Sequence, residues 1–122
     1  MPLYGSLTLA TELFPGDLGT IVNAEQLGTG GKSERVAFGR PSGFLQPVSV
    51  TFSYATVPAA VSYDIQVANE DVDALYIKIG NTTNVNGDRV DINTLTGGLN
   101  FNFLRVKEIT SPGVNATVKV LA

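Results

Sequence analysis

Carboxylates are the most abundant titratable side chains of this chain, and three of them, Glu70, Asp71 and Asp73, crowd one short segment. A pair of carboxylates performs glycoside hydrolysis, so a two-carboxylate hydrolase is the enzyme to consider first. Such a site also needs a cleft walled by aromatic rings, whereas the aromatic residues here mostly fall at inward positions of predicted strands. We therefore interpret residues 69–73 as a polar loop that ends a strand, and we predict no catalytic residue.

Several other chemistries are excluded by residue types that the chain lacks. It has no Cys and no His, and its single Met is Met1. A thiolate nucleophile, a Ser/His/Asp triad and a Cys- or His-based zinc site therefore cannot be built. With 8 Lys plus Arg against 11 Asp plus Glu, the formal net charge is -3, which disfavours nucleic acid as a partner.

A calcium site is the second candidate for chemistry. Asn84, Asn86 and Asp88 have the alternate spacing of a calcium-binding loop. The sixth position of that loop is Arg89, where the template has Gly for a sharp turn. Asn86 followed by Gly87 is instead typical of a tight β-hairpin. We predict a hairpin here, with no metal ion and no cofactor.

No segment of the sequence has the character of a membrane span or a signal peptide. No window approaches the roughly 18 apolar residues that span a bilayer. The N-terminal residues have neither the basic region nor the unbroken apolar region of an export signal. We expect a soluble protein without an export signal and without a membrane partner.

The elements that must position these residues are short, and Gly and Pro divide the chain into two parts. Residues 1–47 are interrupted throughout by Gly and Pro, which leaves room only for short strands at 20–25 and 35–39. The Gly-rich run at 28–33 predicts a mobile loop. We expect an N-terminal arm with irregular short strands, followed by a strand-rich body at 48–122.

From residue 48 onward, apolar residues alternate with polar ones, which indicates half-buried antiparallel strands. Strands are predicted at 48–54, 61–69, 75–79 and 100–109, with shorter ones from 90 and from 117. Turn residues at 111–113 predict a final hairpin, and a β-bulge near Phe103 would reconcile the two phases of apolar residues around it. The chain is therefore predicted to be a single all-β domain, an antiparallel β-sandwich or jelly roll with an extended Gly/Pro-rich N-terminal segment.

Three stretches of the first part carry a resemblance to a known family. They are FPGDLGT at 14–20, IVNAE at 21–25 and VAFGRP at 36–41. In this order they resemble the structural cement, or decoration, proteins of tailed-phage capsids, in which such a stretch precedes a β-rich body. Residues 41–43 depart from the family's pattern, which continues the strand with apolar residues.

The resemblance implies a non-enzymatic virion structural protein on the capsid exterior, which cements the shell by bridging neighbouring copies of the major capsid protein. It also fits a symmetric homo-oligomer, either a dimer or a trimer. The residues implied to contact the capsid or another copy are Leu3, Tyr4, Leu7, Leu13, Phe14, Phe38, Arg40, Phe44 and Leu45. An alternative is that the apolar members of this set other than Phe38 cover an open end of the sandwich in the monomer.

The main alternative function is a small receptor- or carbohydrate-binding sandwich of a phage tail or fibre. A sugar-binding module needs exposed aromatic platforms. The chain has no Trp, so the candidate platforms are Tyr4, Phe14, Phe38, Phe44 and Tyr76.

Overall fold

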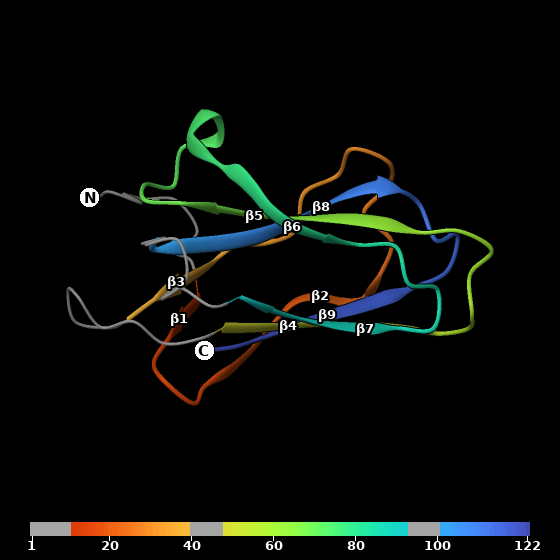
Figure 1. Cartoon of the computed structure of the whole chain (residues 1–122), viewed down its shortest axis with the longest axis horizontal. Coiled ribbons are helices and arrows are strands. Elements are labelled where there is room, and N and C mark those ends of the chain that lie inside the picture. The colour runs from red at the N-terminus through yellow and green to blue at the C-terminus, as the bar shows by residue number, and fades with distance from the viewer. Residues whose placement is uncertain (1–10, 40–47, 93–100) are drawn as a thin grey trace.

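The computed structural model describes residues 11–39, 48–92 and 101–122, and β-strands make up its regular structure apart from one 3-10 turn. The elements are β1 (Thr11–Leu13), β2 (Leu18–Glu25), β3 (Val36–Phe38), β4 (Val48–Tyr54), β5 (Ser62–Ala68), η1 (Asp73–Leu75), β6 (Ile77–Thr82), β7 (Asp88–Ile92), β8 (Phe103–Thr110) and β9 (Ala116–Leu121). Two sheets pack face to face, as Figure 1 shows, and this confirms the predicted all-β sandwich. Within the described ranges, no helix has the length and apolar character of a membrane span.

Consecutive strands mostly belong to opposite sheets. The five-stranded sheet has the order β1-β3-β8-β5-β6, and the four-stranded sheet has the order β2-β9-β4-β7. Neighbouring strands are antiparallel except for β1 and β3, which are parallel. Among the described strands, only β5 and β6 are both consecutive in the chain and adjacent in one sheet.

The two predicted hairpins, at Asn86 and Gly87 and at residues 111–113, are therefore wrong, although both segments do turn the chain. β6 and β7 lie in different sheets, and so do β8 and β9. Gly87 and Gly113 adopt φ angles of 92° and 70°, a region that favours glycine. Turn residues determine where the chain reverses, whereas burial of the next strand's apolar face determines which sheet that strand joins.

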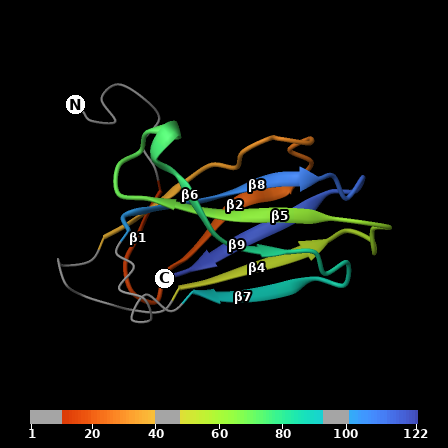
Figure 2. The same cartoon turned by 45° about the horizontal axis from the view of Figure 1, so that its top comes forward.

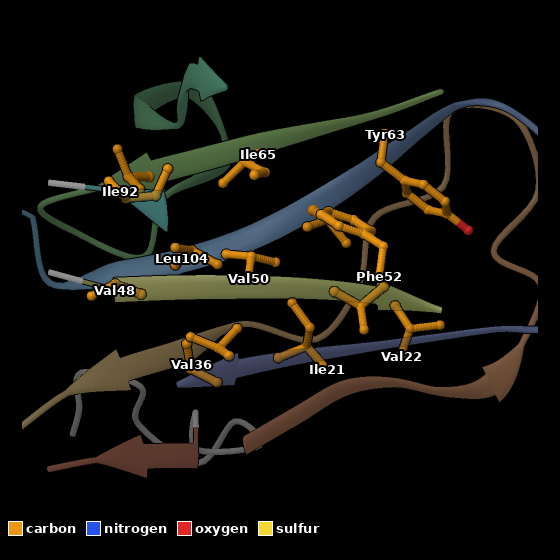
Figure 3. Packing of buried hydrophobic residues seen from close by; sticks show 14 of the residues in the cluster. Ile21, Val22, Val36, Val48, Val50, Phe52, Tyr63, Ile65, Ile92 and Leu104 are labelled. Atoms are coloured by element: carbon orange, nitrogen blue, oxygen red, sulfur yellow. The ribbon is translucent and has the colours of Figure 1, made fainter. Parts of the chain in front are cut away.

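The core lies between the sheets and follows the predicted alternation of the strands. In β4, Val48, Val50 and Phe52 are buried, and Figure 3 shows them facing Ile65 and Leu104 of the opposite sheet. β-branched and aromatic residues supply most of this core, as suits a pleated and half-buried surface.

Strand β8 is covered on both faces, which explains the two phases of apolar residues in its sequence. Leu104 and Val106 belong to the central core, whereas Phe103 packs on the outer face against Ala68 and Tyr76. The β-bulge predicted near Phe103 is wrong, because a covered outer face accounts for the change of phase without one. The register shift of β8 against β5 lies near the far end of the strand.

In the segment predicted as a strand at 75–79, the strand begins later, and the residue that is buried is not one of those predicted to face inward. Residues 73–75 form the 3-10 turn η1, and β6 begins at Ile77. Tyr76 is buried on the outer face of the five-stranded sheet, while Leu75 and Ile77 are exposed. The tyrosine takes the buried position because its ring covers apolar surface and its hydroxyl has a hydrogen-bond acceptor there.

Residues 28–33 are held along β8 rather than forming the predicted mobile loop. The Gly30 N–H donates to the Glu108 carbonyl at 2.6 Å, and the Glu108 N–H donates to the Gly31 carbonyl at 2.8 Å. Residues 11–39 contribute β1 and β3 to one sheet and β2 to the other, so this part of the chain is not an arm beside the body.

Candidate binding surfaces

The sandwich has two ends with different connections. At one end lie the connections β4–β5, β6–β7 and β8–β9 and the residues that follow β2, as Figures 1 and 2 both show. The name "loop end" is used below for residues 26–31, 55–61, 83–87 and 111–115. At the opposite end lie the β1–β2 turn, the end of β9 and the segment that contains η1. The name "terminus end" is used for residues 14–18 and 69–77 and for Leu121.

Exposed apolar side chains gather at the terminus end. Of the eight large apolar side chains that are exposed in the described ranges, six belong to this end. They are Phe14, Leu18, Val72, Leu75, Ile77 and Leu121. The other two are Val57 in the loop end and Ile109 beside it. Contiguous exposed apolar surfaces are typical of protein–protein contacts.

Phe14 is held in place by the turn that joins β1 to β2. Its N–H donates to Oδ2 of Asp17 at 2.9 Å, and the Asp17 N–H donates to the Phe14 carbonyl at 2.9 Å. The ring lies against Gly39, where an added Cβ would come within 2.7 Å of it. Leu18, which follows the turn, is the cross-strand partner of Leu121. Hydrogen bonds within the turn thus hold the backbone that carries these exposed apolar side chains.

Residues 69–77 project from the outer face of the five-stranded sheet, near the top of Figure 1. Tyr76 anchors this segment by packing on Ala68 and Phe103, with Ala37 beside them. Two of the three exposed apolar residues of the segment are the sequence neighbours of this buried tyrosine. The segment therefore buries one aromatic side chain and presents aliphatic ones.

An ion-pair network centred on Arg105 ties the segment to the sheet. Arg105 is 9% exposed, and its Nη1 lies 2.8 Å from Oδ1 of Asp73. Its Cζ lies 3.8 Å from the centroid of the Tyr76 ring, and its Nε donates to Gln66 at 2.9 Å. Lys32 contacts the other Asp73 oxygen at 3.2 Å. The hydrogen bond from Arg105, followed by that from Lys32, lowers the pKa of Asp73 below its ordinary value of 3.8.

Asp71 forms the second anchor of the segment. It pairs with Arg35 and accepts a hydrogen bond from the Tyr76 hydroxyl at 2.9 Å. Burial, followed by this hydrogen bond, raises the pKa of Tyr76. Because Asp71 and Asp73 are both bound to the sheet, Val72 between them is held in an exposed position. Such preorganisation lowers the entropy cost of binding a partner.

These contacts give the clustered carboxylates a structural role. Asp71 and Asp73 each have an arginine partner, and the pKa of Asp73 is lowered, whereas the general acid of a glycosidase needs a raised pKa. Residues 69–73 do end a strand, as predicted, but they are bound to the sheet rather than free in solvent. The network could not be predicted from the sequence because Arg35 and Arg105 lie far from the aspartates in the chain.

The residues with calcium-loop spacing are used by the turn between β6 and β7. Oδ1 of Asn84 accepts a hydrogen bond from the Asn86 N–H at 3.0 Å, and Oδ2 of Asp88 accepts one from the Thr82 hydroxyl at 2.7 Å. In the part of the chain that the structure describes, no group of three or more acidic, His or Cys side chains is arranged to hold a metal ion.

The predicted interface residues fall into three groups. Leu13 and Phe38 are buried in the core, so their side chains do not reach a partner. Phe14 is exposed. Leu3, Tyr4, Leu7, Arg40, Phe44 and Leu45 lie outside the described residues. Of the aromatic residues considered as sugar platforms, Tyr76 is also buried, so Phe14 is the exposed one in the described ranges.

One carboxylate that sequence analysis did not single out is buried between the sheets. Glu108 is 0% exposed, and its Oε1 accepts a hydrogen bond from the Tyr63 hydroxyl at 3.0 Å. Its Oε2 and the Tyr54 hydroxyl are buried without a hydrogen-bond partner among the described residues. Burial, followed by the charge of Asp88, raises the pKa of Tyr54 to about 12. The sequence did hold a signal, because Glu108 continues the inward alternation of β8.

The geometry defines a two-sheet β-sandwich with most of its exposed apolar side chains at one end. This fold is similar to that of the SPBc2 prophage-derived protein YomS. The crystal structure of YomS matches this chain at a TM-score of 0.54 and 12% sequence identity, over 85% of this chain and 90% of YomS. At that identity, the likeness establishes a shared fold. No protein-family model and no curated protein matches the sequence.

Proposed function

We propose that this chain is a non-enzymatic virion structural protein, which decorates the exterior of a phage capsid and bridges neighbouring copies of the major capsid protein. Two observations support the phage context. Residues 14–41 resemble capsid cement proteins, and the fold is shared with a prophage-derived protein.

The observation that carries the proposal is the concentration of exposed apolar side chains at the terminus end. Protein interfaces draw most of their binding free energy from a few large side chains that become fully desolvated. The group around the β1–β2 turn and the group on residues 69–77 are held by different elements on opposite sides of the sandwich, so the same end offers two separate apolar contacts. A cement protein that bridges subunits needs such contacts on a rigid body.

Binding to assembled capsid shells that lack this protein tests the proposal. Shells and unbound protein are separated by sedimentation, and host cells are tested in parallel. The wild-type chain is expected to sediment with the shells and to stay in solution with the cells. Retention on cells but not on shells would overturn the cement role and would support the receptor-binding module of a tail or fibre.

Two substitutions locate the contact. Phe14→Ser and Leu75→Ser each remove an exposed apolar side chain from the terminus end, and each is expected to weaken shell binding by about tenfold, which corresponds to about 1.4 kcal/mol. Thr51→Ala, on the exposed face of β4, is the matched control and should bind like the wild type. Equal binding by all three variants would show that the terminus end is not the capsid contact.

A further inference from the structure

The loop end carries no formal charge. Its four segments contain no Asp, Glu, Lys or Arg, although the chain has 8 Lys plus Arg and 11 Asp plus Glu. Charges begin at its rim, with Glu25 at the end of β2, Lys32 after the first segment and Asp88 at the start of β7. A centre depleted of charge with a polar rim is one compositional feature of protein–protein interfaces.

The loop end exposes one large apolar side chain, and its connections are internally bonded. Val57 is 68% exposed, which is the highest exposed fraction among the large apolar side chains of the described residues. Two connections hold one another, because the Ala55 N–H donates to the Asn115 carbonyl at 2.9 Å. The Gly113 N–H donates at 3.2 Å to a hydroxyl within its own turn. Backbone donors that are already hydrogen bonded cost little desolvation free energy when a partner covers them. Loops that are already ordered lose little conformational entropy on binding.

We propose that the loop end is the interface through which two copies of this chain form a symmetric dimer. A twofold interface places the same surface on both partners, so charges near its axis would face their own copies. The chain has a formal net charge of -3, so two copies repel one another least where the facing surfaces carry no charge. The loop end meets both conditions. Its segments contain no aromatic residue, which argues against a sugar ligand at the same place.

The dimer would also explain how one protein bridges two subunits, and this role rests on the proposed function. The terminus end lies opposite the loop end in both views of the molecule (Figures 1 and 2). A dimer joined at its loop ends therefore presents two terminus ends that point away from each other. Each would contact a different capsid subunit.

Sedimentation equilibrium of the full chain, measured over a range of concentrations, tests the dimer. The wild type is expected to be dimeric. Val57→Glu and Ala59→Glu each place two like charges in the interface, and each is expected to weaken association at least tenfold. Thr51→Glu adds the same charge on the exposed face of β4, and this control should remain dimeric. Thermal unfolding checks that every variant is folded.

A wild-type chain that is monomeric at every concentration would overturn the inference. The inference would also fail if both loop-end variants formed dimers with the same affinity as the wild type. A dimer that weakens steeply with added salt would place the contact on a charged surface and would overturn it as well. Shell binding separates the two proposals. A monomer that still sediments with shells overturns the dimer alone, whereas a loop-end dimer that does not bind shells overturns the capsid function alone.

Discussion

The guanidinium of Arg105 lies 3.8 Å from the centre of the Tyr76 ring, and both side chains are largely buried on the outer face of the five-stranded sheet. This stack joins β8 to the segment that carries three of the exposed apolar residues. A cation over an aromatic ring contributes about 0.5–2 kcal/mol, depending on how far it is desolvated. The planar guanidinium also bonds Asp73 through Nη1 and Gln66 through Nε while it lies over the ring, whereas a lysine carries all its donors on one terminal atom and has no planar group to stack.

Arg105→Lys should therefore loosen residues 69–77 without unfolding the sandwich. The charge is kept, but the stack and the paired hydrogen bonds are lost. Hydrogen exchange of the amides at 72–76 is expected to accelerate by about tenfold, whereas exchange in β4 and β9 stays as in the wild type. Arg89→Lys alters a comparable pair with Asp91 on an exposed strand and should change little. Uniform acceleration over the whole chain would contradict a local role for Arg105.

Acid should release the same segment. The pKa of Asp73 is lowered in the folded protein, so its stabilising contribution is present above the ordinary value of 3.8 and is lost as the pH falls through the lowered pKa. Exchange at 72–76, corrected for the intrinsic rate, is expected to be constant from about pH 7 to about pH 4 and to accelerate below that range. Asp73→Asn should already exchange faster at neutral pH. The same pH dependence in both proteins would exclude Asp73 as the titrating group.

The buried pair of Tyr63 and Glu108 predicts that removing one polar partner costs more stability than replacing both. Tyr63→Phe leaves both carboxylate oxygens of Glu108 without a partner and should lower the free energy of unfolding by about 1–3 kcal/mol. Combining Tyr63→Phe with Glu108→Leu replaces both polar groups by apolar ones, and this double variant should be at least as stable as the wild type. Urea denaturation measures both. A double variant that loses as much as Tyr63→Phe alone would contradict the prediction.

Two glycines should respond oppositely to an added methyl group. At Gly31, a Cβ would clash with the carbonyl oxygen of Leu27, a backbone atom that cannot rotate away, so Gly31→Ala should cost about 1–3 kcal/mol of stability. At Gly80, a Cβ would lie 3.7 Å from Val90 and 3.8 Å from Ile65, which is ordinary contact. Gly80→Ala should leave stability unchanged or raise it by about 0.4–1 kcal/mol. Thermal unfolding of the two variants compares them directly, and equal losses would argue against the close packing of Gly31.

The strands of the second half could be predicted because alternation of apolar and polar residues is a local property. β4 and β5 lie within a residue of their predicted bounds. The pairing of strands could not be predicted, because a turn such as Ser111-Pro112-Gly113 has the same residues whether the next strand stays in the sheet or crosses to the other one.

The binding surfaces could be predicted only in part. The family resemblance predicts Phe14 as an interface residue, and its side chain is exposed. The alternation in the sequence predicts that Leu75 and Ile77 share one buried face of a strand. They are exposed instead, because Tyr76 takes the buried position. That choice depends on Phe103 and Arg105, which come from a strand far along the chain. No local pattern contains this information.

The order of the strands also bears on when the protein can fold. β8 separates β3 from β5 in one sheet, and β9 separates β2 from β4 in the other. Residues 103–121 therefore complete both sheets, and the earlier strands cannot pair across the gaps without them. Since so few strands pair with their neighbours in the chain, we expect folding on the scale of about milliseconds to seconds. A chain still emerging from the ribosome would hold two unfinished sheets until β9 is free, so strand pairing during synthesis is limited to β1 with β3, β4 with β7 and β5 with β6.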